Sequence, residues 1–144
     1  MYDTVLVPTD GSDISLAAAE EAVELTADGG TVHALSVIEE LPLHKQSGRG
    51  AKLEAKDRTD ERAHLEAATD RIEELTEAAG VDCVTTATEG VPYREILGHA
   101  EEIDADAIVM GKRGLGAAAN DLMGSTTERV ARRASTTVVT VPET

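Results

Sequence analysis

Aromatic residues are almost missing from this chain, which has no Phe, no Trp and only two Tyr among 144 residues. Its core must therefore be built from Val, Ile, Leu and Ala, and hydrophobic residues at 41% of the chain are enough for one. A domain of about 150 residues buries roughly 68–70% of its unfolded surface. We therefore expect one globular domain over residues 1–144 and no extended disorder.

Basic charge is also scarce, with 13 Lys and Arg against 28 Asp and Glu and a formal net charge of −15. This balance argues against nucleic acid as a partner, because phosphate backbones are bound by clustered cations. At about 1 M salt the Debye length falls to roughly 3 Å and screens the repulsion between like charges. The acidity predicts a halophilic protein, with an ordinary acidic protein as the alternative.

Cysteine and long apolar runs are scarce as well. Cys83 is the single cysteine, which excludes an internal disulfide, and its apolar surroundings predict a strand position. No apolar run approaches the length of about 18 residues needed to span a membrane, and the opening residues do not form a signal peptide. We therefore expect a soluble, cytoplasmic protein with no membrane partner.

What the sequence does contain is a regular alternation of strands and helices. Apolar runs predict strands at residues 5–7, 31–38, 81–89, 105–111 and 136–141. The intervening segments have helical periodicity, with Ser12 as the first cap, the Asp-Gly-Gly at residues 28–30 as the first stop and Pro92 as a later start. This alternation predicts an α/β fold with a parallel sheet and helices on both faces.

One segment breaks the alternation, from Glu39 to Lys52, where no period is visible. It is predicted as a loop, followed by a long helix that ends near residue 79. The loop contains the positive group of His44, Lys45, Arg49 and Lys52. Three roles stay open for it: a lid over a ligand, a contact for an acidic partner, or a mobile surface loop.

Glycines gather after the fourth predicted strand, in the segment MGKRGLGAAANDLMGSTTERV at residues 110–130. Ligands of open parallel sheets bind at the carboxyl ends of strands, where the strand order reverses. With the strand order 3-2-1-4-5, this segment and the turn that contains Asp10 would lie side by side. Gly111 and Gly114 would let backbone N–H groups approach an anion, and Gly124 and Ser125 begin a helix whose N-terminus suits a phosphate.

Two of these residues have simpler explanations. Ser125 and Glu128 fit the spacing of a capping box, which would occupy the Ser125 side chain. Asp10 suits a ribose hydroxyl, but it also suits an ordinary turn. The glycine segment matches neither the Walker A string nor G-x-G-x-x-G.

In this segment the sequence resembles the universal stress protein family. The family motif G-x2-G-x9-G-[ST] is matched by Gly111, Gly114, Gly124 and Ser125. VPTDGS, GVPYREIL and GSTTERVARRASTTVVTVP resemble other parts of the family, so the resemblance covers nearly the whole chain. It implies an open five-stranded parallel sheet of order 3-2-1-4-5, Rossmann-like and similar to adenine nucleotide alpha hydrolases. It also implies that ATP is bound. Mg²⁺ is a candidate accompanying ion, because Asp121 could help to hold a divalent cation beside the phosphates.

The resemblance also implies roles for individual residues. Adenine and ribose would be surrounded by Pro8, Thr9, Asp10 and Val37. The phosphates would be held by Gly111, Gly114, Gly124 and Ser125, flanked by Met110 and Thr126. The chain departs from the family at Asn120 and Asp121, where many members have a basic residue. Lys112 and Arg113 are candidates to compensate for that loss. A homodimer would form through the last strand, from Thr136 to Val141.

These observations predict a dimeric regulatory module of the stress response that binds an adenine nucleotide. One alternative is a nucleotide-free module of the same fold that acts through protein partners, and another is an enzyme of the alpha-hydrolase type. The sequence has no Walker lysine and no clear catalytic base, and His33, His44, His64 and His99 are scattered. We therefore expect no catalytic residue and no metal site, at most slow hydrolysis, and a nucleotide that orders residues 39–52.

Overall fold

The computed structural model describes residues 1–39, 49–113 and 123–142, apart from the side chains of residues 49–58. The elements in chain order are β1 (Tyr2–Thr9), α1 (Asp13–Leu25), β2 (Thr26–Glu39), α2 (Arg49–Ala78), β3 (Asp82–Gly90), α3 (Pro92–Glu102), β4 (Ala107–Gly111), α4 (Ser125–Arg133) and β5 (Thr137–Val141). The five strands form one sheet of order β3-β2-β1-β4-β5, in which every neighbouring pair is parallel. The predicted fold and strand order are confirmed.

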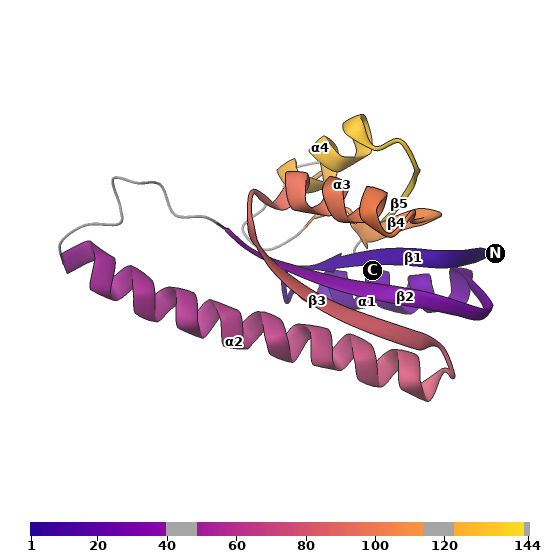
Figure 1. Cartoon of the computed structure of the whole chain (residues 1–144), viewed down its shortest axis with the longest axis horizontal. Coiled ribbons are helices and arrows are strands. Elements are labelled where there is room, and N and C mark those ends of the chain that lie inside the picture. Colours follow the sequence, from indigo (N-terminus) through magenta and orange to yellow (C-terminus); the bar gives the residue numbers. More distant parts are fainter. Residues whose placement is uncertain (40–48, 114–122, 143–144) are drawn as a thin grey trace.

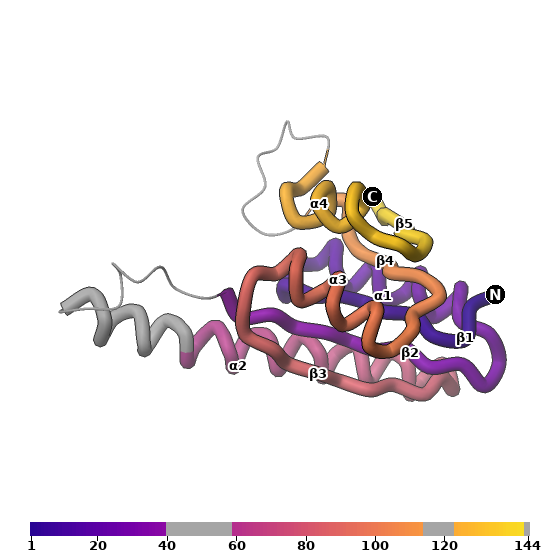
Figure 2. The backbone as a smooth tube through the Cα atoms, turned by 45° about the horizontal axis from the view of Figure 1, so that its top comes forward, coloured from indigo at the N-terminus to yellow at the C-terminus, as the bar shows by residue number. Residues whose placement is uncertain are grey.

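The sheet lies between two layers of helices (Figure 1). α1 and α2 pack on one face, α1 mainly on β1 and β4 and α2 on β2 and β3. α3 and α4 contact each other on the opposite face, as the tilted view in Figure 2 shows. The change of face follows from right-handed crossovers, because the chain moves along the sheet in one direction from β1 to β3 and in the other from β3 to β5.

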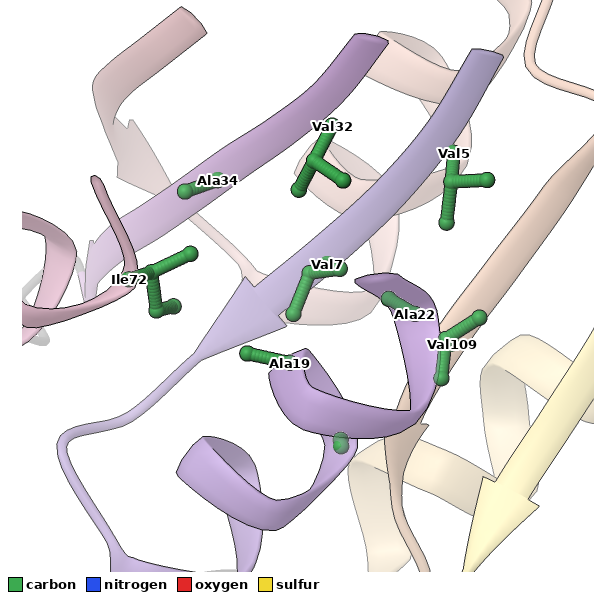
Figure 3. Packing of buried hydrophobic residues seen from close by; sticks show 9 residues of the cluster. Val5, Val7, Ala19, Ala22, Val32, Ala34, Ile72 and Val109 are labelled. Atoms are coloured by element: carbon green, nitrogen blue, oxygen red, sulfur yellow. The ribbon is translucent and has the colours of Figure 1, made fainter. Parts of the chain in front are cut away.

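Each face of the sheet has its own core of small aliphatic side chains. On the α1 and α2 side, Val5 and Val7 of β1 meet Val32, Ala34 and Val109 from neighbouring strands, Ala19 and Ala22 of α1, and Ile72 of α2 (Figure 3). On the other side Leu6 packs with Leu35 and Ile108, beneath Ile96 and Val130. Side chains of a strand alternate between faces, so β1 supplies both cores. The expectation of a core without aromatic residues is confirmed for these buried clusters.

The predicted end of the first helix was wrong, because α1 ends at Leu25, before the Asp-Gly-Gly at residues 28–30. The Thr26 hydroxyl donates to the carbonyl of Ala22 at 2.7 Å, and the Thr26 backbone is already extended. β2 therefore begins at Thr26, and the strand register shifts before Thr31 pairs with Thr4. A side chain on Gly30 would lie 2.9 Å from the Asp3 carbonyl, so these glycines serve an irregular strand start.

The predicted loop from Glu39 to Lys52 was too long at both ends. Glu39 is the last residue of β2, and α2 already begins at Arg49. The remaining part, including His44 and Lys45, lies outside the described residues. On α2 the predicted buried face is confirmed at Leu65, Ala68 and Ile72.

Candidate functional site

The turn after β1 is held by short hydrogen bonds within the sequence Thr-Asp-Gly-Ser. Asp10 Oδ1 accepts from the backbone N–H of Ser12 at 2.9 Å, and Gly11 donates its N–H to Thr9 Oγ1 at 3.2 Å. Gly11 has a φ of +84°, a conformation that suits glycine. Asp10 therefore does form the turn that the sequence allowed, through one of its carboxylate oxygens.

Below this turn, a buried pair of hydroxyls joins β1 to the start of α1. Thr9 Oγ1 and Ser15 Oγ share a hydrogen bond of 2.8 Å, and Ser15 Oγ also donates to the Ser12 carbonyl at 2.7 Å. Ser12 caps α1, accepting from the Ser15 N–H at 3.3 Å, as predicted. The hydroxyl of Thr9 is thus engaged by the protein itself, and the turn is held rigidly against α1.

The end of β4 is tied to the beginning of α4. Thr127 is buried, and its hydroxyl donates to the Gly111 carbonyl at 2.9 Å. The Gly124 N–H donates to the carbonyl of Lys112, also at 2.9 Å. These bonds place the N-terminus of α4 beside the carboxyl end of β4, where the glycine segment was predicted to form a site.

The capping box that the spacing of Ser125 and Glu128 allowed as an alternative does not form. Gly124 is the N-cap residue, Ser125 is the first residue of α4, and the cap makes no side-chain hydrogen bond. Glu128 instead forms a 2.7 Å ion pair with Arg132 on the next turn. The Ser125 side chain is exposed and does not close the helix end. Helix N–H groups at this end therefore lack the side-chain acceptor that a capping box would have provided.

Gly111 has a packing role that the sequence did not indicate. A Cβ at this position would lie 3.0 Å from both Cγ1 and Cγ2 of Ile14, and 3.1 Å from the Arg113 carbonyl. Ile14 belongs to the first turn of α1, which crosses the end of β4. The missing side chain thus lets α1 approach β4 closely, whether or not a ligand is bound.

A pocket of about 450 Å³ opens between these two strand ends. Its walls include nine of the ten predicted site residues, namely Pro8, Thr9, Asp10, Val37, Met110, Gly111, Gly124, Ser125 and Thr126. Gly114 is the tenth and lies outside the described residues, as do Asn120 and Asp121. Small-molecule sites in proteins commonly have about 300–1,000 Å³. The sequence therefore located the pocket, although lining it does not by itself establish a role for any residue.

The remaining pocket residues were not singled out as a site. They are Ser12, Ser15, Leu35, Glu39, Glu61, His64, Leu65, Pro92, Ile96, Arg113 and Thr127. His64 lies against Gly11, where an added Cβ would collide with its imidazole. Glu61 and His64 have the spacing of one helix face, but nothing in the sequence says that α2 crosses the end of β2. Arg113 was named only as a compensating charge, and it does line the pocket.

The two kinds of polar residue in the pocket have different chemistry. Gly124, Ser125 and Thr126 bring a helix N-terminus, which favours an anion. Asp10, Glu39 and Glu61 bring carboxylates, which accept hydrogen bonds from hydroxyl or amino groups. Leu35, Ile96 and Met110 are buried apolar neighbours. The pocket therefore suits a ligand that combines an anionic group, hydroxyls and an apolar part.

Among the described residues, His33 and Cys83 have a shifted pKa and lie outside the pocket. Burial lowers the pKa of His33 on β2, and the nearby His99 of α3 lowers it further, with ring centres 6.3 Å apart. Burial likewise raises the pKa of the Cys83 thiol on β3. None of these three side chains lines the pocket. Across residues 1–39, 49–113 and 123–142, no group of three His, Cys, Asp or Glu is arranged to hold a metal ion.

Comparison with known proteins finds relatives over nearly the whole chain. The profile of the Universal stress protein family matches residues 1–142. A universal stress protein of Methanocaldococcus jannaschii is 33% identical over 142 residues, which cover 98% of this chain and 82% of that protein.

Solved structures agree with this. Universal stress protein UspA from Lactobacillus plantarum has a TM-score of 0.86 at 26% identity, with 97% of each chain covered. A universal stress protein crystallised in complex with cAMP has a TM-score of 0.68 at 31% identity, covering 98% of this chain and 97% of that one. None of the described helices is long and apolar enough to cross a membrane.

Proposed function

The chain belongs to the Universal stress protein family, and on this premise we propose that it binds an adenine nucleotide, with ATP as first candidate. The observation that carries the proposal is the pocket itself, where the turn after β1 meets the uncapped N-terminus of α4. The relative that was crystallised with cAMP supports an adenine nucleotide as the class of ligand.

The pocket chemistry suggests how such a ligand would be held. Phosphate oxygens would accept N–H bonds at the start of α4, with the hydroxyls of Ser125 and Thr126 beside them. Asp10 would accept hydrogen bonds from ribose hydroxyls, and Val37 and Met110 would contact the base. Mg²⁺ commonly binds through phosphates and one or two carboxylates, so any such ion would arrive with the nucleotide.

We propose a binding protein rather than an efficient enzyme. Fast phosphoryl transfer needs a positioned water and cations that stabilise the transferring group. The helix N-terminus and Arg113 offer an anion site, but the carboxylates of the pocket would repel negative charge. Hydrolysis, if it occurs, is expected to be slow, and the nucleotide would then act as a regulatory signal.

The proposal also covers the oligomeric state of the protein and its environment in the cell. β5 is an edge strand of the sheet with half-buried side chains at Val138, Val139 and Val141. An edge of this kind needs cover, so a homodimer through β5 is physically reasonable. We also propose a cytoplasmic, salt-adapted protein, on the basis of its net charge of −15. Sedimentation at about 0.2 and 2 M KCl tests the dimer, because a monomer at every protein concentration would exclude it.

The nucleotide site is tested by titration calorimetry with Mg-ATP, ADP, AMP and cAMP, after checking the purified protein for bound nucleotide. Ser125→Glu places a carboxylate at the first position of α4, where acidic residues suit the helix, so the fold should persist. It should weaken ATP binding by about tenfold or more through repulsion at the phosphates. Ser135→Glu adds the same charge at an exposed residue outside the pocket and is the matched control.

A folded protein that contains no nucleotide, and gives no heat at millimolar concentrations of any of the four ligands, would exclude the proposal. That result would favour the module that acts through protein partners alone. Equal weakening of ATP binding by Ser125→Glu and Ser135→Glu would show a general charge effect and would refute the placement of the phosphates at the start of α4.

A further inference from the structure

Three arginines surround the single tyrosine of α3, on the helix layer formed by α3 and α4. The guanidinium carbons of Arg94, Arg129 and Arg133 lie 5.7, 5.3 and 4.9 Å from the centre of the Tyr93 ring. Arg94 Nε and Arg133 Nη1 also donate to the Tyr93 hydroxyl, at 3.1 and 3.2 Å. We call these four residues the arginine cluster.

This gathering is unusual in a chain with so few cations. Only 13 of 144 residues are Lys or Arg, against 28 acids, yet three of the 13 meet at one side chain. Within the described part of the chain, none of the three guanidinium groups forms an ion pair. Arg132 of α4 differs from them, because it forms an ion pair of 2.7 Å with Glu128 on the same helix.

Joining α3 to α4 does not account for the whole cluster. A single arginine of α4 over the ring would connect the two helices, and the attraction between one cation and an exposed ring is modest. Adding two more cations brings mutual repulsion and leaves all three arginines exposed. Each guanidinium group has five N–H donors, so exposed arginines can also donate hydrogen bonds to the carboxylates of a binding partner.

We propose that the arginine cluster is a docking surface for an acidic segment of a partner protein, one that carries two or more spaced carboxylates. Charge complementarity favours this occupant, because the chain has a net charge of −15 and the cluster gathers three of its cations at one exposed place. Tyrosine and arginine are also the residue types that dominate binding energy at protein interfaces.

Other anions fit less well. A nucleic acid carries charge along its whole length and would meet the repulsion of a protein with net charge −15 outside this small area. The proposal is independent of nucleotide binding, because none of the four residues lines the pocket. The two ideas can therefore fail separately.

The test uses the whole ¹⁵N-labelled protein at about 0.15 M KCl, where the Debye length is about 8 Å. The probe is a synthetic peptide of ten glutamates, with ten glutamines as the neutral control and ten-residue oligothymidylate as the nucleic-acid comparison. Binding of the glutamate peptide should shift amide resonances of residues 93–97 and 126–134. The glutamine peptide should shift none, and the oligonucleotide should bind more weakly than polyglutamate.

Variants separate the cluster from general charge. Arg129→Gln with Arg133→Gln should raise the Kd for polyglutamate by about two- to thirtyfold, the range for losing two exposed charge contacts. Arg71→Gln with Arg132→Gln removes the same charge from exposed positions outside the cluster and should change the Kd by less than about twofold. Circular dichroism and thermal melting check that both double variants are folded.

Several outcomes would overturn the proposal. They are no binding of polyglutamate, resonance shifts spread over other faces, equal weakening by both double variants, or tighter binding of the oligonucleotide. A dimer that dissociates only in the Arg129→Gln and Arg133→Gln variant would also overturn it, since the cluster would then join two copies of this chain.

Discussion

Replacing Gly111 by Ala distinguishes two reasons for a glycine at the end of β4. The new methyl group would lie 3.0 Å from two carbons of Ile14 and 3.1 Å from the Arg113 carbonyl. Relief requires a shift of Ile14 or of α1 away from β4, and a separate shift of the backbone at Arg113. Overpacking of this kind costs about 1–3 kcal/mol. For a chain of about 150 residues this corresponds to a fall in Tm of roughly 2–12 °C.

A double-mutant cycle tests whether Ile14 is the cause. Ile14→Ala alone should destabilise the protein by about 2 kcal/mol, at the low end for such truncations, since Ile14 is 9% exposed. In the double variant the methyl group added by Gly111→Ala occupies part of the space that Ile14 leaves. The double variant should therefore be more stable than the sum of the single effects predicts, by about 1 kcal/mol. The contact with the Arg113 backbone remains, so rescue is incomplete.

The assay is urea unfolding followed by far-UV circular dichroism, together with calorimetric titration of Mg-ATP on each variant. Additive free energies, or a Gly111→Ala variant within about 0.5 kcal/mol of the parent, would refute the packing argument. Loss of nucleotide binding without loss of stability would instead favour a glycine that lets the ligand approach the backbone.

Three further predictions concern residues outside the pocket. Burial holds the pKa of His33 below its usual value of 6.5, so the folded protein favours the neutral imidazole. The free energy of unfolding should therefore be fully retained above about pH 6.5 and fall on acidification, by less in His33→Gln than in the parent. Urea midpoints of both proteins at about pH 7.5 and 5 test this. Arg94 donates to the Tyr93 hydroxyl and lowers its pKa, so Arg94→Gln should raise the midpoint of the Tyr93 absorbance titration in a Tyr2→Phe background. Ile72 is 1% exposed on the buried face of α2, and Ile72→Ala should cost about 2–5 kcal/mol in urea unfolding, whereas a loss below about 1 kcal/mol would contradict its core position.

The sheet was predictable because its signal is local and strong. Apolar runs such as Val5–Val7 lie on central strands, and the helix faces with Leu65, Ile72 and Ile96 point to the two cores. Boundaries were harder, because they depend on contacts distant in sequence. β2 starts at Thr26 since a threonine hydroxyl closes α1 and the strand pairs with Tyr2, neither of which periodicity reveals.

Some residues of the pocket could likewise be located from the sequence, whereas others could not. Asp10, Gly111, Gly124 and Ser125 could be placed at the pocket from the order of a parallel sheet. The resemblance to a family added the other predicted residues that line it, namely Pro8, Thr9, Val37, Met110 and Thr126. His64 and Glu61 were missed because their place depends on how α2 crosses the end of β2. The capping box does not form because the N-cap residue is Gly124, whereas the Ser-x-x-Glu spacing requires Ser125 at that position.

The central strand β1 is synthesised well before its neighbour β4, so the junction between these two strands forms late. β1 pairs with β2 over most of its length, but its other edge meets β4 through Val5 with Ala107 and Leu6 with Ile108. That edge stays unpaired until β4 has been made. The pocket spans the same junction, with Asp10 following β1 and Gly124 following β4. A chain that stops before α4 therefore has half of the pocket, and a nucleotide bound across the junction would stabilise only a chain that contains both halves.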